Sequence, residues 1–328
     1  MTLTINTNVS SIITQRNLNN ATNSLNKSIE RMSTGYKINQ AKDNAAGYSI
    51  SNMWETQIGS LDVAADNAAT GADLLTTAEQ TYGLLTEHLQ RIRDLTEQAA
   101  NGTYGSSSLK SIQSEVVARL QEVSRIAANS EFNGIKLMSY TQGAKDTGIS
   151  ADGINLQVGL YSDENSIINL KVDLFEDASV KGLFKDQTGI ETNLEKANGK
   201  KVDNLNSDEG YKAFAAACAG LKVGKKGDLE LQTDDAYGAN KMLTYIDAAI
   251  NEISSRTTAI GAAQNRVESA ISAIDVQSQN LTSSLSTLRD TDVASESSNY
   301  IQAQILQQAS ATLLATANQT PSIALNLI

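Results

Sequence analysis

Cysteine, histidine, proline and aromatic residues are all scarce in this 328-residue chain. It has one Cys (Cys218), one His (His88) and one Pro, and aromatic residues make up 5% of the sequence. Zinc fingers, cysteine-ligated clusters, disulfide scaffolds and two-cysteine redox motifs need more Cys or His than this. With so few rings, the interior must be built from aliphatic side chains. An enzyme here would depend on carboxylates, Ser or Lys, and we predict no catalytic residue, no metal and no cofactor.

Positive charge is scarce as well, because 37 Asp and Glu outnumber 26 Lys and Arg and give a net charge of −11. Phosphate binding needs a surplus of Lys and Arg on one face, so we expect no nucleic-acid partner. No apolar run approaches the roughly 20 residues of a membrane span, so we expect no membrane insertion. Residues 1–15 have neither a charged side chain nor a continuous apolar stretch. This predicts no cleaved signal peptide and, if the chain leaves the cell, another export route.

Apolar residues repeated in sevens predict two long helices that pack against each other. The carboxy-terminal series is Ile246, Ile253, Ile260, Val267, Ile274, Leu281 and Leu288, with Ile250, Ile271 and Leu285 beside it. At 1.5 Å per residue this helix is about 65 Å long and needs a partner of similar length. The amino-terminal half supplies one, with Leu61, Ala68, Leu75, Tyr82 and Leu89 in one row and Ala64, Gly71, Ala78, Leu85, Ile92 and Ala99 in the other.

Two shorter elements are predicted after the Asn101-Gly102 step. Residues 109–130 form a third helix that packs back antiparallel, with its apolar face made of Ile112, Val116, Leu120, Val123 and Ala127. Residues 153–172 alternate in two short runs around a polar turn at residues 162–165. Alternation of this kind is typical of a β-hairpin.

The middle of the chain differs in composition from its flanks. All nine Arg lie at or before Arg125 or at or after Arg256, whereas twelve of the seventeen Lys fall between Lys145 and Lys241. Glycine-containing turn steps gather in the same stretch. We therefore predict a mainly α fold, a long antiparallel coiled-coil bundle built from both termini, with a β-hairpin and a small mixed α/β middle domain.

The two ends of the chain are almost free of charge. Asp, Glu, Lys and Arg are all absent from residues 1–15 and 297–328. Disordered tails are usually charged and poor in aliphatic residues, which does not describe these ends. Amphipathic ends rich in Ala, Gln, Ser and Thr fit surfaces that are buried against other protein, where an unpaired charge is costly. The alternative is that the two ends merely close the coiled coil of a single chain.

Several stretches resemble bacterial flagellin in sequence and in order. They are residues 5–8 (INTN), 33–47 (STGYKINQAKDNAAG), 89–95 (LQRIRDL), 98–102 (QAANG), 132–134 (FNG), 303–309 (AQILQQA) and 317–319 (ANQ). The similarity covers roughly residues 1–175 and 238–328. Cys218 departs from the usual family pattern and lies outside the matched stretches.

The resemblance implies a secreted structural subunit that polymerises into the flagellar filament. It implies export in an unfolded state through the flagellar type III apparatus, an export chaperone, a filament cap and a homopolymer outside the cell. The expected parts are an inner filament core from residues 1–40 and 292–328, a coiled-coil bundle with the hairpin from 41–175 and 238–291, and a variable surface domain from 176–237. Two alternatives are a hook-filament junction protein and an amphipathic helical protein that binds surfaces.

Two sets of residues are candidate interaction sites. Spacing places Arg91 and Leu95 on one helix face and Glu115 and Arg119 on the antiparallel neighbour. By resemblance these positions, with Gln90, match the flagellin surface that Toll-like receptor 5 binds, and the alternative is a salt-bridged seam between monomers. The expected inner-core assembly residues are Leu18, Leu25, Ile29, Met32, Ile301, Ile305, Ala309 and Leu313. We expect these charge-poor ends to order only on polymerisation, because they hold too few large apolar residues to offset the entropy of folding.

Other reactive residue types give weaker signals. His88 has no second His for a metal site, and it flanks the helix seam at Leu89. Cys218 lies in an Ala-rich run and is expected to be a small buried apolar side chain. The carboxylate pairs Asp234-Asp235 and Asp290/Asp292 are expected to be solvated surface groups.

Overall fold

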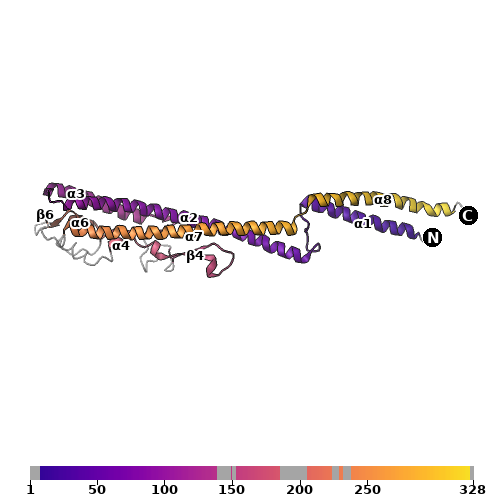
Figure 1. Ribbon diagram of the computed structural model, residues 1–328, viewed down its shortest axis with the longest axis horizontal. Helices are drawn as coiled ribbons and strands as arrows, with labels where there is room; N and C mark the ends of the chain where they lie inside the picture. Colours follow the sequence, from indigo (N-terminus) through magenta and orange to yellow (C-terminus); the bar gives the residue numbers. More distant parts are fainter. Residues whose placement is uncertain are drawn as a thin grey trace. The chain divides into compact units, whose positions relative to one another are not determined.

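The computed structural model describes residues 8–138, 149, 153–184, 205–223, 229–231 and 238–325 (Figure 1). Its helices are α1 (Val9–Thr34), α2 (Ala45–Ala100), α3 (Ser106–Asn129), α4 (Val180–Phe184), α6 (Asp208–Cys218), α7 (Ala239–Arg289) and α8 (Val293–Leu325). Its strands are β1 (Glu131–Phe132), β2 (Ile135–Lys136), β3 (Ile154–Gln157), β4 (Ile167–Leu170), β5 (Leu221–Val223) and β6 (Leu229–Leu231). The predicted mainly α fold with small β elements is confirmed.

Two compact units divide the chain, one of Met1–Asp62 with Val276–Ile328 and one of Val63–Asp275. The boundary cuts through α2 and α7, whereas the predicted three-part division follows helix ends. That division concerns the assembled state, and it stays a prediction.

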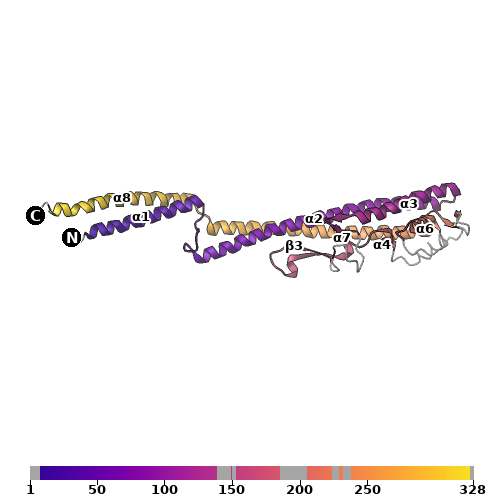
Figure 2. The same cartoon turned by 180° about the vertical axis from the view of Figure 1, so that it is seen from behind.

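The core of the Val63–Asp275 unit lies along the predicted seams. Every residue of the amino-terminal rows from Ala64 to Ile92 is buried on α2, and α7 is fully buried at Ile246, Ile253, Ile260 and Val267. Arg93 of α2 contacts Asp247 of α7, and Glu79 contacts Gln264, so the two helices run antiparallel. Figure 2 shows α2, α3 and α7 side by side.

The third helix also forms as predicted. Leu109, Ile112, Val116, Leu120, Val123 and Ala127 are the buried residues of α3. Arg91 of α2 reaches Glu115 and His88 reaches Arg119, so α3 runs antiparallel to α2. A three-helix core of aliphatic side chains results, with Tyr82 as its one fully buried ring on these helices.

The predicted hairpin is present as β3 and β4. The strands pair antiparallel with Ile154 opposite Leu170 and Leu156 opposite Ile168. Gly71 of α2 explains how the hairpin docks, because a Cβ at this position would lie 2.3 Å from a methyl carbon of Leu156. The absence of a side chain at Gly71 therefore leaves the space in which Leu156 of the hairpin packs against α2.

Part of the predicted surface domain also packs inward. Residues 213–219, which include Cys218, are fully buried in and just after α6, and Phe214 stacks against Phe184 of α4 with ring centroids 4.7 Å apart. Gln121 of α3 donates to Asp208 at the start of α6. The expectation that Cys218 is a buried apolar side chain is confirmed.

The other unit contains α1 and α8, which run antiparallel and pack on each other. Gly35, at φ +77°, ends α1 and donates its N–H to the carbonyl of Arg31. The connectors that follow α1 and precede α8 are joined by backbone bonds from Lys37 N to Arg289 O at 2.6 Å and from Thr291 N to Gly35 O at 2.8 Å. Asp292 caps α8 by accepting from the Ala294 N–H, so this carboxylate has a structural role.

Candidate functional site

The pair formed by α1 and α8 is held by small and polar groups. Its buried residues are Ala21, Ser28, Glu296, Ala303 and Ser310. Polar bonds join the helices along their length, from Asn8 Nδ2 to Ala317 O, from Ser11 Oγ to Asn318 Oδ1 and from Gln307 Nε2 to Thr22 Oγ1. An interface of this kind brings two helices close without burying much apolar area.

The large apolar residues of the same pair point mostly outward. Among the predicted assembly residues, Leu18 and Leu25 are half-buried and Ala309 is exposed. The other five are exposed, with relative accessibilities of 47% for Ile29, 38% for Met32, 51% for Ile301, 59% for Ile305 and 60% for Leu313. In the single chain these eight residues do not share a core. Val9, Ile12, Ile13 and Leu306 add to the exposed set.

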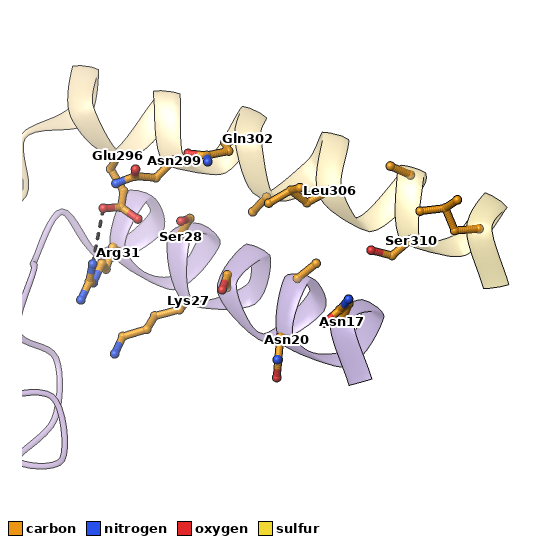
Figure 3. Close-up of a pocket in the computed structure, with 15 residues that line it drawn as sticks. Asn17, Asn20, Lys27, Ser28, Arg31, Glu296, Asn299, Gln302, Leu306 and Ser310 are labelled. Carbon is orange, nitrogen blue, oxygen red and sulfur yellow. Dashed lines mark ion pairs between the residues drawn. The ribbon is translucent and has the colours of Figure 1, made fainter. Parts of the chain in front are cut away.

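A groove of about 710 Å³ lies between α1 and α8 (Figure 3). Amide, hydroxyl and small side chains make up most of its lining, with Leu306 and Leu313 as its larger apolar members. The Arg31–Glu296 ion pair, at 3.5 Å, crosses from one helix to the other at one end of the groove. The groove therefore offers amide and hydroxyl groups beside an exposed apolar face.

The charges of this unit gather near the two connectors. Lys27 pairs with Asp43 at 3.1 Å, and Arg289 pairs with Glu55 at 2.9 Å while its guanidinium lies 4.3 Å from the Tyr36 ring centroid. The hydrogen bond from Lys27 is the main cause that holds the pKa of the Asp43 carboxyl below its usual value. Ion pairs thus hold the connectors, whereas residues 8–15 and 297–319 have no charge at all.

The second candidate site lies on the paired faces of α2 and α3. Arg91 Nε donates to Glu115 Oε1 at 2.9 Å, and Arg119 Nη2 lies 3.9 Å from the same oxygen. Gln90 and Arg91 are exposed, and Arg119 is part-exposed beside them. Leu95 is different, because it is 2% exposed and belongs to the core beneath this surface. The structure therefore brings Arg91, Glu115 and Arg119 together at one surface, leaves Gln90 exposed next to Arg91 in the sequence, and places Leu95 in the core.

Sequence reasoning missed a buried charge at Arg256. This residue lies three positions after Ile253, in a row with Ala249 and Ala263 that is buried on α7, whereas the predicted second row of Ile250, Ile271 and Leu285 is only half-buried. Its Nε donates to Glu252, and its two Nη atoms donate to the carbonyl and the carboxylate of Glu176. Tyr82 donates to the carbonyl of Leu174 in the same chain segment. Burial is the main cause that raises the pKa of the Tyr82 hydroxyl. The available signal was a series in sevens, Ala249, Arg256 and Ala263, with one charged member between two small apolar ones.

The reactive residue types give no candidate for catalysis. Burial raises the pKa of the Cys218 thiol to about 12, which leaves it protonated and unreactive at neutral pH. Among the described residues, no group of three or more His, Cys, Asp and Glu is placed to hold a metal ion. No described helix is both long and apolar enough to cross a membrane. Asp234 and Asp235 lie outside the described residues.

Comparison with known proteins shows which family the chain belongs to. Residues 5–143 match the model of the bacterial flagellin N-terminal helical region, and residues 243–328 match that of the C-terminal helical region. Flagellin B of Vibrio cholerae is 34% identical over 375 residues, which covers all of both chains. The chain belongs to the bacterial flagellin family.

Further relatives have the same character. Polar flagellin B/D of Vibrio parahaemolyticus is 35% identical over 377 residues, again with full coverage of both chains. The crystal structure of Bacillus cereus flagellin aligns with a TM-score of 0.40 and 21% identity, covering 67% of this chain and 94% of that one. As a family member, the chain is a structural subunit of the bacterial flagellar filament. The family is one of structural proteins, which agrees with the predicted non-enzymatic role.

Proposed function

We propose that the charge-free parts of α1 and α8 are the surface through which copies of this chain pack in the inner core of the filament. The observation that carries the proposal is the outward placement of Ile12, Ile13, Ile301, Ile305 and Leu313, all of which lie in these charge-free parts. Full burial of one such side chain is worth about 1.5–3 kcal/mol, and about half of each is still exposed. Packing between subunits recovers that energy.

The polar groove fits the same role. Its amide and hydroxyl groups, among them Asn17, Asn20 and Gln302, can pair across a subunit contact and so avoid the cost of unpaired buried polar groups. Charged side chains at these positions would need an ionic partner in every subunit contact. This explains why the ends combine Gln, Asn and Ser with Ile and Leu rather than with Lys and Glu.

A charge placed in the apolar face tests the proposal. Ile305→Glu is expected to abolish elongation of filaments from seeds, because the carboxylate would be buried without a partner in each new contact. Tyr161→Glu is the matched control, since Tyr161 is 64% exposed but lies outside α1 and α8. Normal elongation by the Ile305→Glu variant, measured by electron microscopy, would refute the proposed surface.

The route to the filament follows from family membership rather than from geometry. We propose export in an unfolded state by the flagellar type III apparatus, with an export chaperone and a filament cap as partners and the extracellular filament as the destination. A hook-filament junction protein is the less favoured alternative, because the relatives aligned over the full chain are named flagellins.

We also propose that the monomer is bound by Toll-like receptor 5 through Gln90, Arg91, Glu115 and Arg119, with Leu95 supporting them from below. Arginine held by a carboxylate is pre-positioned for hydrogen bonding, and Arg is enriched at interface hot spots. The same surface would also serve a salt-bridged seam between monomers in the filament. The two roles are compatible, since one acts on the monomer and the other on the polymer.

Binding of folded monomer to the receptor ectodomain tests this second function. Arg91→Ala is expected to weaken binding by roughly 30-fold, the equivalent of about 2 kcal/mol at a buried interface position. Arg93→Ala is the matched control, because Arg93 is also on α2 but pairs with Asp247 of α7 and with Glu97. Equal affinity of wild type and Arg91→Ala would leave the cluster with a role in filament packing alone.

A further inference from the structure

The only histidine of the chain lies inside the proposed receptor surface. His88 is half-buried on α2, and its Nδ1 lies 3.3 Å from Nη1 of Arg119 on α3. Arginine has donors and no acceptor, so Nδ1 must be unprotonated to accept this bond. The contact therefore requires a neutral imidazole.

One carboxylate oxygen links this contact to Arg91. Glu115 Oε1 accepts from Arg91 Nε at 2.9 Å and lies 3.9 Å from Arg119 Nη2. His88, Arg119, Glu115 and Arg91 thus form a chain of contacts in which Arg119 lies between an imidazole and a carboxylate. If Arg119 loses the imidazole, Glu115 is the anion within its reach, and Arg91 then shares that oxygen with a second guanidinium.

We propose that His88 is a pH-sensitive switch that sets the positions of Arg119 and Arg91 on this surface and weakens partner binding when it is protonated. The partner is the receptor proposed above, so this part of the inference rests on that proposal. Histidine is the one side chain whose charge ordinarily changes between pH 5 and 8. His88 is the one histidine of the chain, and its contact with Arg119 lies on this surface.

The charged groups around His88 come from α2 and α3 and favour the change. Glu87 and Arg91 flank it on α2, while Glu115, Arg119, Glu122 and Arg125 are the charged residues on the facing part of α3. Arg125 is the main cause that lowers the pKa of Glu122, and the charge of His88 contributes to it. A protonated imidazole is therefore repelled by Arg119 and attracted by an ionised Glu122, which draws it away from the Arg119 contact.

Nuclear magnetic resonance of the full-length monomer tests the switch without any receptor. We expect the Nε–H signals of Arg91 and Arg119 to shift between pH 8 and pH 5 with the same midpoint as the single imidazole. In the variants His88→Asn and His88→Gln, whose amide oxygens can accept from Arg119 but do not titrate, these shifts should be lost. Arg93 is the internal reference because it pairs with Asp247 of α7. The switch would be overturned if the arginine signals shifted with a midpoint different from that of the imidazole. It would also be overturned if they shifted in the two variants as much as in the wild type.

Receptor binding at pH 7.5 and pH 5.5 then tests whether the switch changes affinity for the receptor. Exposed charge pairs contribute about 0.2–1 kcal/mol, so we expect wild-type affinity to fall by about 1.4- to five-fold more than that of His88→Asn. Comparison with this variant cancels titration of the receptor itself. If the arginine signals shift with the imidazole but receptor binding depends on pH equally in wild type and His88→Asn, the link between the switch and receptor binding is overturned. Failure of the receptor proposal itself is distinguishable, because Arg91→Ala would then bind as wild type does at pH 7.5.

Discussion

The Val63–Asp275 unit and the α1–α8 pair use helices in opposite ways. In the former, Leu75, Leu85, Leu89 and Ile92 are completely buried against neighbouring helices of the same chain. In the latter, the buried residues are Ala, Ser and Glu296, and most of the Ile and Leu residues are exposed. A helix pair that buries small residues and exposes large apolar ones gains little free energy from folding alone, because little apolar area is removed from water. We expect this difference to separate the part of the chain that is stable as a monomer from the part that becomes stable only in the polymer.

The α7 repeat shows the same change within one helix. Its seam residues are buried from Ile246 to Ile274, whereas Leu281 and Leu288, in the same series of sevens, are only half-buried. The apolar repeat continues to Leu288, although other residues of this chain bury its last two members less completely. Unused apolar area in a regular repeat is a sign of packing that another copy completes.

The largest expected effect comes from removing α8. Deletion of residues 292–328 should abolish filament elongation completely and leave the helices of the Val63–Asp275 unit intact, because their core is made within the chain. Electron microscopy with wild-type seeds and circular dichroism of the monomer measure the two results. Elongation by the truncated chain would show that α8 is not required for assembly.

Single truncations of large apolar side chains sharpen the comparison. Leu89→Ala should destabilise the monomer by about 2–5 kcal/mol, because it leaves a cavity in a fully packed core. Ile305→Ala should change monomer stability by no more than about 0.5 kcal/mol, because its side chain is already exposed. Urea unfolding of both monomers gives the values. Similar losses for the two variants would remove the distinction between the regions.

Arg256 is expected to be of intermediate importance. Arg256→Ala should cost about 1–3 kcal/mol, since it removes the hydrogen bonds to Glu176 and Glu252 and leaves a cavity where a buried side chain packed against α2. Arg256→Met fills the seam with an apolar side chain of similar length and should lose less. If urea unfolding shows Arg256→Met to be less stable than Arg256→Ala, the charge of Arg256 contributes more to stability than its packing.

The smallest effect concerns the connectors of the α1–α8 unit. The pKa of Asp43 is lowered in the folded chain, so its ionised form stabilises the fold above the unfolded pKa, and this contribution is lost as pH falls through the lowered folded value. Asp43→Asn should therefore reduce the loss of stability on acidification below about pH 4. Asp62→Asn, on α2, is the control. Urea midpoints at pH 7 and pH 3 that change equally in the two variants would contradict the role of the Lys27–Asp43 pair.

Periodicity predicted most of the fold because the core repeats along helices. The seams of α2, α3 and α7 and the β3–β4 hairpin each follow from residue spacing over a short range. Arg256 was not predicted, because its partner Glu176 is 80 residues away and only the folded chain brings them together. Spacing places Leu95 one helical turn after Arg91, but its burial depends on the neighbouring helices and could not be predicted from spacing.

The surface domain predicted at residues 176–237 shows a similar limit. Turn composition and Lys content indicated an outward module, yet the Ala-rich α6 within it packs against α3 and is buried at residues 213–218. Replacement of the whole range by a linker is therefore expected to expose the apolar surface that α6 covers. The outward module and the three-part division remain proposals about the filament.

Hydrogen exchange of monomer and filament tests the central claim most directly. The account predicts that amides of α2, α3 and α7 in the Val63–Asp275 unit are protected in both forms, because their cover comes from the same chain. Amides of α1 and α8 should exchange rapidly in the monomer and become protected only in the filament. Equal protection of α1 and α8 in the monomer would contradict the account, because it would mean that the pair is stable without other copies.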